Sequence, residues 1–388
     1  SQVLKCSKNR NGDVIIATTS FVGVIDIDAK LTIEIIPKIY NSNDRASLQN
    51  LFYMLSYSRQ FNIPDKNISN LEKYSGSFFE ILVGMFSEEL LNKVQNSAHH
   101  EYVIDENNHT YLRGKLLMSA HLKSNGFIAN KFYIQTDDFT ANNILNQTLK
   151  FVSTGLYNIT TEPDNKKRIR KCLALFDEVD SVRINRAQVS RIKLNRINKR
   201  FENLLMLAKL FINNQTLVAK SGKHESWTIL IDMNELFENF IAQALKNGLK
   251  YSKYNIITQG PQKRFVYNIQ DDRAVFVTKP DISIMLQGTV IQIADTKYKI
   301  LAEDDLKYGV SQADLYQMFA YSRKYRTSDI TLIYPMTNNV LPHTLELPDN
   351  TRVSERSISL ERNIRKEIKN IEKELVSLFI KNREEIKI

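Results

Sequence analysis

A change of sequence pattern near residue 226 constrains the fold of this chain more than any other feature. The polar stretch Asn213–Ser226 is typical of a linker, and after it the apolar residues repeat at helical and strand spacings. The expected elements are a helix at 233–249, strands at 255–268, 274–285 and 289–298, a helix at 312–325, a strand at 329–334 and a closing amphipathic helix at about 363–381. This order predicts a carboxy-terminal α/β domain around a mixed central sheet.

Two acidic residues and one lysine lie on the second and third of these strands. The apolar run PDISIML begins with Pro280 and Asp281, a turn follows at 287–288, and TVIQIADTKYK returns as the next strand. Because side chains alternate along a strand, Asp295 and Lys297 point to one face of it. The hairpin can therefore bring Asp281 beside them.

This arrangement suits a divalent metal ion. The carboxylates of Asp281 and Asp295, helped by the backbone carbonyl of Thr296, would form a hard oxygen site for Mg²⁺, with Mn²⁺ as a substitute. The ammonium of Lys297 could then orient an attacking water and stabilise charge growing on a phosphate. The alternative is an ordinary Asp/Lys pair at a strand end, although an acid that ends a buried strand is costly without a partner.

The helix before these strands offers a further carboxylate. In NELFENFIAQAL, Glu235 and Glu238 lie three residues apart, on adjacent turns. Glu238 follows the apolar Leu236 and Phe237, which places it near the edge of the sheet as an additional metal ligand. Glu235 is expected to be an exposed acid of the first turn.

The helix after the strands carries two Gln/Tyr pairs at i and i+4. They are Gln312 with Tyr316 and Gln317 with Tyr321. Each Gln could hydrogen-bond a phosphate or orient the catalytic lysine, and each Tyr could pack or contact DNA. Ordinary helix packing is the alternative for both pairs.

The amino-terminal part of the chain predicts a small β unit followed by helices. Residues 13–40 have the alternation of β structure, with a turn at Ala29 and Lys30. Helices are expected at 48–59 and 78–94, strand-like runs between 102 and 135, and a helix at 141–156 with its N-cap at Asp138 or Thr140. The charged stretch 162–171 is expected to be a surface connection.

A concentration of positive charge lies in the middle of the chain. Of the formal net charge of +10, the segment 166–200 contributes twelve Lys/Arg against three acids, which is +9. Such a cluster favours a polyanion, so we predict DNA contact. The residues assigned to it are Arg191, Lys193, Arg196, Lys199 and Arg200. A solvated helix face is the alternative.

Other features exclude several classes of protein. Cys6 and Cys172 are too few for a disulfide framework or a four-cysteine zinc site, and His99 with His100 is expected to be a solvated loop pair rather than a metal site. No run of roughly 20 uncharged apolar residues occurs, so no membrane contact is expected and the cytoplasm is the default compartment. A GxxxxGK[ST] pattern is also absent, so nucleotide hydrolysis would belong to a partner.

The motifs together resemble a known nuclease family. Pro280-Asp281, Asp295-Thr296-Lys297 and the order of elements are similar to the PD-(D/E)xK nuclease fold, and QxxxY resembles its RecB-like branch. Within it the chain resembles McrC, the nuclease subunit of the McrBC modification-dependent restriction system. The matching segments are NLFYMLSYS at 50–58, DDFTANNILNQTLKF at 137–151, MNELFENF at 233–240, VIQIADTKYK at 290–299 and DLYQMFAYS at 314–322.

The resemblance implies roles for these residues. Asp281 and Asp295, with Glu238, would bind the metal, Lys297 would activate water, and Gln317 with Tyr321 would occupy the QxxxY position. It also implies an amino-terminal region, including GVIDIDAKLTIEIIPKI, that docks on a hexameric McrB-like AAA+ GTPase and stimulates its GTP hydrolysis. Recognition of methylated bases would belong to that partner.

The expected protein is therefore a multidomain α+β endonuclease subunit that cuts double-stranded, methylated DNA. Its segments would be a β-rich and helical partner-docking region at 1–160, a basic helical segment and linker at 161–225, and the nuclease domain at 226–388. Two copies would have to meet on DNA to cut both strands. The alternative from another class is a non-catalytic activator of an AAA+ ring, with a nuclease-like fold as its scaffold.

Overall fold

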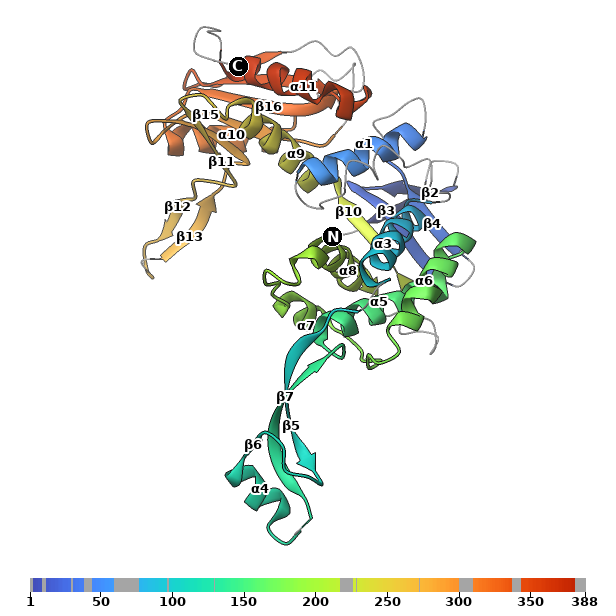
Figure 1. Ribbon diagram of the computed structural model, residues 1–388. Coiled ribbons are helices and arrows are strands. Elements are labelled where there is room, and N and C mark those ends of the chain that lie inside the picture. Colours follow the sequence, from blue (N-terminus) through green and yellow to red (C-terminus); the bar gives the residue numbers. More distant parts are fainter. Residues whose placement is uncertain are drawn as a thin grey trace. The chain divides into compact units, whose positions relative to one another are not determined.

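The protein divides into two compact units, which we describe separately. In the computed structural model, unit 1 comprises Ser1–Gly23, Glu34–Leu71 and Leu230–Ile388, and unit 2 comprises Val24–Ile33 and Glu72–Ile229. The residues that the structure describes are 3–8, 12–28, 31–37, 44–58, 77–95, 98–128, 130–216, 226–227, 229–271, 273–299, 310–336 and 343–380 (Figure 1). The expected turn at Ala29 and Lys30 and most of the expected linker lie outside them.

Unit 1 contains a six-stranded mixed sheet with the order β11-β14-β15-β16-β18-β17. Its strands are β11 (Tyr254–Thr258), β14 (Ile282–Leu286), β15 (Thr289–Thr296), β16 (Asp329–Met336), β17 (Thr344–Glu346) and β18 (Arg352–Ser359). β11, β14 and β15 run antiparallel, β15, β16 and β18 run parallel, and β17 is antiparallel to β18. The mixed sheet and the α+β class are as the sequence predicted.

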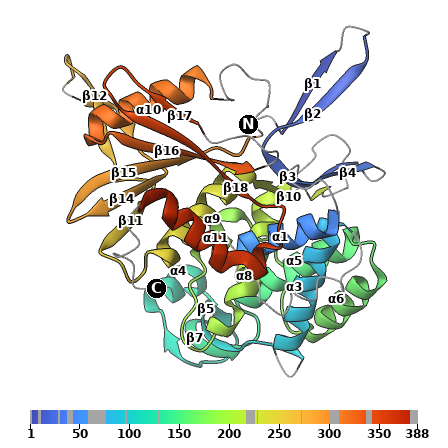
Figure 2. The same cartoon turned by 90° about the horizontal axis from the view of Figure 1, so that it is seen from above.

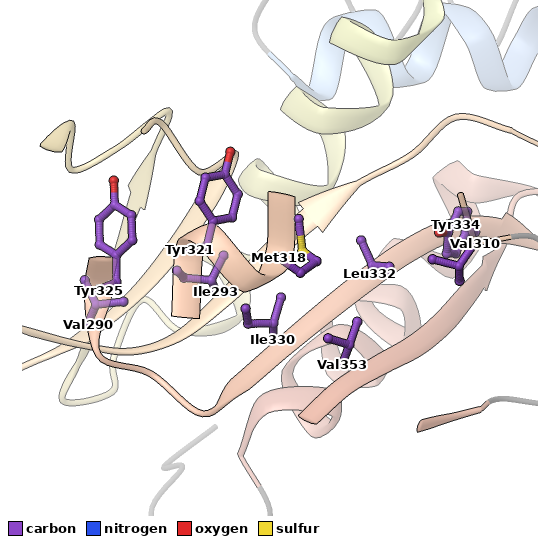
Figure 3. Close-up of a cluster of buried hydrophobic side chains, with 10 residues drawn as sticks. All are labelled: Val290, Ile293, Val310, Met318, Tyr321, Tyr325, Ile330, Leu332, Tyr334 and Val353. Carbon is purple, nitrogen blue, oxygen red and sulfur yellow. The ribbon is translucent and has the colours of Figure 1, made fainter. Parts of the chain in front are cut away.

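Helices lie on both faces of this sheet (Figure 2). They are α9 (Met233–Gly248), α10 (Gln312–Tyr325) and α11 (Ile364–Phe379), and α1 (Asp44–Tyr57) packs on α9 and α11. On the α10 side, Met318 and Tyr321 pack in one buried cluster with Ile293 and Ile330 of the sheet (Figure 3). The core of unit 1 is therefore continuous from α10 to the central strands.

The amino-terminal helix α1 packs against the carboxy-terminal helices. The side chain of Asn50 donates hydrogen bonds to the carbonyls of Leu360 (3.1 Å) and Arg362 (2.9 Å) and accepts one from the amide of Ile364 (3.1 Å). A Cβ at Gly248 would lie 2.6 Å from Val376 Cγ2, so α9 and α11 approach closely. These contacts explain why an early segment of the chain belongs to unit 1.

The strand prediction needs one correction. The segments expected at 255–268 and 274–285 each contain two strands, which adds β12 (Lys263–Asn268) and β13 (Arg273–Thr278). These two form a separate antiparallel ribbon that projects from the sheet (Figure 1). Pro261 and Pro280 stand at the interruptions, and proline cannot donate a hydrogen bond to a sheet ladder. β17 and β18 were not anticipated, because Ser, Glu and Arg interrupt their apolar pattern.

The amino-terminal strands agree with the expected β structure. They are β1 (Leu4–Lys8), β2 (Val14–Thr18), β3 (Phe21–Asp28) and β4 (Leu31–Ile35). β1 pairs antiparallel with β2, and β3 and β4 belong to a small sheet that includes β10 (Ile229–Asp232). The division between the units runs through this small sheet.

Unit 2 combines a helical body with a long β arm. The body contains α3 (Phe78–Val94), α5 (Ile144–Ile159), α6 (Pro163–Leu175), α7 (Arg186–Arg191), the 3₁₀ helix η2 (Lys199–Phe201), α8 (Glu202–Asn214) and the short pair β8 (Gln215–Thr216) and β9 (Ser226–Trp227). The arm contains β5 (Glu101–His109), β6 (Lys115–Leu116), α4 (Met118–Asn125) and β7 (Phe132–Thr140) (Figure 1).

Two local predictions in unit 2 were wrong. The stretch 162–171 is not a connection but the start of α6, in which Pro163 occupies a first-turn position that tolerates proline. The N-cap of α5 is Asn143, whose side chain accepts from the amide of Asn146; Asp138 and Thr140 belong to β7. The helix α4 was also missed. The compact units and the three segments expected from sequence divide the chain differently, and the functional assignment of those segments stays a prediction.

Candidate active site

The pairing of β14 with β15 brings the two aspartates together. Ile282 lies opposite Ala294, so Asp281 falls beside the end of β15. The Oδ2 of Asp281 accepts hydrogen bonds from the amide (2.9 Å) and the hydroxyl (3.0 Å) of Thr296. The connecting turn, Gln287 and Gly288, has positive φ at both positions (49° and 81°), as a tight two-residue hairpin requires. A short hairpin thus fixes the relation of the two acids.

Lys297 lies between Asp295 and α10. Its Nζ is 2.7 Å from Asp295 Oδ2 and donates to Gln317 Oε1 at 3.3 Å. The amide nitrogen of Gln317 donates to Asp295 Oδ1 (3.4 Å) and to the hydroxyl of Tyr321 (2.8 Å), which donates to the carbonyl of Lys279 (3.1 Å). Five residues from two strand ends and one helix are thereby joined into one network.

Only the second of the two Gln/Tyr pairs reaches this network. Gln312 and Tyr316 hydrogen-bond each other at 2.5 Å, and both are exposed. Tyr321 is buried against the sheet, and Figure 3 shows its ring beside that of Tyr325. The Tyr325 hydroxyl donates to the carbonyl of Pro261 (2.6 Å), at the base of the β12–β13 ribbon.

Burial and like charge make Asp295 an unusual carboxylate. Its side chain is 1% exposed, and Oδ2 makes no hydrogen bond of good geometry beyond its ion pair with Lys297. Burial, and then the charge of Asp281, raise the pKa of Asp295, while Lys297 opposes the rise. Burial alone would lower the pKa of Lys297, but the charges of Asp295 and Asp314 outweigh it, so this pKa is raised overall. Each of the two charges therefore favours the ionised form of the other group.

Glu238 stands next to the aspartates on α9. Its Oε1 accepts a hydrogen bond from the side-chain amide of Gln259. Burial, followed by the charge of Asp281, raises the pKa of Glu238 to about 7. Glu235 is exposed in the first turn of α9, as predicted. Glu238 is therefore close enough to Asp281 for the charge of that aspartate to affect it.

The donor set suits a hard divalent cation. Asp281 and Asp295 present carboxylates at one strand end, and Oδ2 of Asp295, buried with only the ion pair to Lys297, is the kind of atom that a cation would satisfy. Among the described residues, however, no group of three His, Cys, Asp or Glu side chains is arranged to hold an ion together. The metal site thus stays a prediction that rests on the two aspartates, with Glu238 as an addition.

Three charged residues were not singled out from the sequence: Asp314, Lys299 and Glu355. Asp314, at the start of α10, lies 3.8 Å from Lys297 Nζ and forms a 2.8 Å ion pair with Lys299. Glu355 on β18 is buried, and burial raises its pKa to about 7, against the charges of Lys299 and Arg356. One local feature could have indicated Asp314: it lies three residues before Gln317, on the same face of the helix. Glu355 had none, because only sheet pairing brings it near.

The basic segment lies on the surface of unit 2. Arg191, Lys193, Arg196, Lys199 and Arg200 are all exposed. None of these five forms an ion pair with another residue in the part of the chain that the structure describes. The guanidinium of Arg200 stacks 4.9 Å from the ring of Phe201. Their positive charge is available to a ligand, and DNA contact stays a prediction.

The histidine pair needs a correction. His99 is buried at 4% exposure rather than solvated, and its ring lies 5.8 Å from that of Phe201. The side-chain amides of Asn143 (2.9 Å) and Asn146 (2.6 Å) donate to its carbonyl. His100 is half-buried. His99 is therefore a packed residue that anchors the start of α5. Within the described ranges, every helix is too short or too polar to cross a bilayer.

The mixed sheet, with two aspartates and a lysine at a strand end and a Gln/Tyr pair on the neighbouring helix, belongs to a multidomain α+β protein. The model of the family "McrBC 5-methylcytosine restriction system component" matches residues 16–335. The chain belongs to this family, which confirms the resemblance seen in the sequence.

A solved structure shows the same fold, and a second one is similar over part of the chain. One is a refined half-complex from a tetradecameric assembly of Thermococcus gammatolerans McrB AAA+ hexamers with bound McrC. It has a TM-score of 0.71 and 22% identity, over 97% of this chain and 86% of that chain. Another is the cryo-EM structure of the Thermococcus gammatolerans McrBC complex, with a TM-score of 0.48 and 25% identity, over 60% of this chain and 68% of that chain. No curated protein matches the sequence.

Proposed function

We propose that this chain is the endonuclease subunit of an McrBC-like restriction system and hydrolyses phosphodiesters of double-stranded DNA. The observation that supports this most is the buried Asp295–Lys297 pair beside Asp281, in a chain that belongs to a restriction-system family. A protein that served only as a scaffold would have no reason to retain such costly buried groups.

In this proposal the residues of the site divide the work. Asp281, Asp295 and the carbonyl of Thr296, with Glu238, would hold Mg²⁺ or Mn²⁺. When bound, the ion polarises the phosphodiester and makes water more acidic. Lys297 directs its ammonium toward the phosphate and stabilises the negative charge that grows there.

Gln317 and Tyr321 support the lysine from α10. Gln317 accepts from Lys297 and donates to Asp295, so it fixes the direction of both charged groups. The Tyr321 hydroxyl accepts from Gln317 and holds it against the backbone at Lys279. This supporting layer makes the geometry of the site independent of surface side chains.

The proposal includes two macromolecular partners. The exposed basic residues of unit 2 would bind the phosphates of double-stranded, methylated DNA. An McrB-like AAA+ GTPase hexamer would recognise the modification, and this chain would stimulate its GTP hydrolysis. Family membership and the shared fold with McrB-bound McrC support this partner. Two nuclease domains would meet on DNA for a double-strand cut.

The test is a cleavage assay with the full chain and its co-purified AAA+ partner. Methylated plasmid should be cut in the presence of GTP and Mg²⁺, and unmethylated plasmid or added chelator should prevent cutting. Asp295→Ala should abolish cleavage while partner binding persists. Glu235→Ala, which removes an exposed acid from the same helix as Glu238, is the matched control and should cut normally. Undiminished cutting by Asp295→Ala would overturn the proposal and favour the scaffold.

A further inference from the structure

We propose that Asp314 is a positioning residue of this site: it holds the ammonium of Lys297 toward the reacting phosphate, and Lys299 fixes Asp314 in turn. The inference rests on the proposed nuclease function and deepens it. It follows from the way the first turn of α10 is built.

The side chain of Asp314 is held in one orientation by a capping box. The hydroxyl of Ser311 accepts from the amide of Asp314 at 3.1 Å, and the amide of Ser311 donates to Asp314 Oδ2 at 3.2 Å. Only this carboxylate oxygen serves the helix end. The other oxygen, Oδ1, is the one that faces Lys297, at 3.8 Å from Nζ.

Lys299 holds the same carboxylate oxygen as the Ser311 amide. Its Nζ donates to Asp314 Oδ2 at 2.8 Å and lies 5.7 Å from the centre of the Tyr334 ring. Burial alone would raise the pKa of Asp314, but the hydrogen bonds from Lys299 and Ser311 outweigh it and lower that pKa. Asp314 is therefore a fixed negative charge beside the catalytic lysine.

Sheet register brings a further acid, Glu355, within electrostatic range of Lys299. Asp295 lies opposite Leu332, and Leu332 lies opposite Glu355, so the two acids occupy one row across three parallel strands. Side chains in such a row share a face of the sheet. Among the residues that the structure describes, neither oxygen of Glu355 has a hydrogen-bond partner, and its charge attracts Lys299. Acidic and basic side chains thus alternate in the order Asp295, Lys297, Asp314, Lys299 and Glu355.

Asp314 gives Lys297 a second negative partner, which is independent of Asp295. Asp295 is the nearer partner at 2.7 Å, but in the proposed function it also binds a divalent ion, which weakens its attraction for the ammonium. Asp314 belongs to another element, α10, and neither contacts Asp281 nor ends a strand. It keeps Lys297 in place whatever Asp295 binds.

The test uses Asp314→Asn, which keeps an acceptor for the Ser311 amide and removes the charge. In the full chain with its AAA+ partner, kcat on methylated plasmid should fall at least roughly tenfold, with KM within about twofold of wild type. Ser311→Ala is the matched control, because it removes only the hydroxyl that caps the helix and leaves the charge of Asp314 and the backbone amide at position 311 that binds its Oδ2. Its kcat should stay within about twofold. Equal kcat losses in the two variants, or wild-type kcat in Asp314→Asn, would overturn the inference.

A second readout needs neither metal nor DNA. Without the contact with Asp314, Lys297 should be acetylated by acetic anhydride at least about threefold faster in Asp314→Asn than in wild type. The folded proteins are labelled and the modification of Lys297 is followed by mass spectrometry. An unchanged rate contradicts the positioning role. If wild type fails to cut plasmid, the nuclease proposal fails while this labelling still decides the contact. If wild type cuts, Asp295→Ala does not, and Asp314→Asn equals wild type, only the positioning role fails.

Discussion

Two buried carboxylates, one in each unit, are treated in opposite ways by the fold. Glu80 on α3 is 5% exposed, and both of its oxygens are hydrogen-bonded. They accept from the hydroxyl of Thr160, the amide (2.7 Å) and hydroxyl (3.1 Å) of Thr161 and the side chain of Asn165 (2.7 Å). Asp295 is 1% exposed, yet its Oδ2 has only the ion pair with Lys297.

The difference separates a structural acid from a reactive one. Glu80 joins the segment after α5 to the first turn of α6, where free amide groups and the amino-terminal end of the α6 dipole favour a negative charge. A fully satisfied buried network rigidifies a fold, whereas an incompletely satisfied one is costly and marks a site of chemistry. Loss of the Glu80 network is thus expected to destabilise unit 2, whereas unit 1 is expected to tolerate loss of the charged side chain at the end of β15.

Replacement of Asp295 should give the largest effect on activity. Asp295→Ala is expected to lower DNA cleavage by roughly 10³-fold or more, because it removes a metal ligand and the partner of Lys297. The free energy of unfolding should not fall, since a buried and poorly satisfied carboxylate disappears while Lys297, which is partly exposed, keeps Asp314 as a partner. Cleavage rates and urea unfolding of the same preparation check both parts. A clear loss of stability in Asp295→Ala would show that Asp295, like Glu80, stabilises the fold, and would contradict the difference between the two acids.

Replacement of Glu80 should do the reverse. Glu80→Ala leaves several buried donors unpaired and is expected to lower the free energy of unfolding by about 3 kcal/mol. Cleavage per folded molecule should be unchanged. Urea unfolding monitored by circular dichroism measures the first quantity, with the exposed Glu178→Ala as control. A stable Glu80→Ala protein would contradict the structural role.

Charge reversal on the basic segment should change DNA binding without changing the site. Arg191→Glu, Lys193→Glu and Arg196→Glu together should weaken binding and flatten the plot of log affinity against log salt by about 3, since each lost phosphate contact removes about 0.9. Fluorescence anisotropy with duplex DNA at several salt concentrations measures the slope. An unchanged slope would assign these residues to a solvated surface.

Glu355 offers the smallest test, through pH. Burial raises its pKa to about 7 in the folded protein, above the ordinary value of 4.5. The folded state therefore binds the proton more tightly, and this contribution to stability, present below pH 4.5, is lost as the pH rises to 7. Glu355→Gln should remove the dependence and gain on the order of 2 kcal/mol over wild type at pH 8. If the free energies of unfolding of wild type and Glu355→Gln change with pH in the same way, the raised pKa of Glu355 is contradicted.

Local sequence patterns predicted the elements that repeat locally and missed contacts between distant segments. The run ending in Asp295 and Lys297 and the helix with Gln317 were visible because strand and helix periods place their side chains. The packing of Asn50 against Leu360 and the row from Asp295 to Glu355 were not visible. They depend on pairing between segments far apart in the chain.

The most direct test of the central claim is calorimetric titration of Mn²⁺ into the full chain and into Asp295→Ala. The account predicts that wild type binds Mn²⁺, that Asp295→Ala does not, and that Glu80→Gln binds as wild type does. Failure of wild type to bind Mn²⁺, with or without DNA, or equal binding by Asp295→Ala, would contradict a metal-dependent site at Asp281 and Asp295.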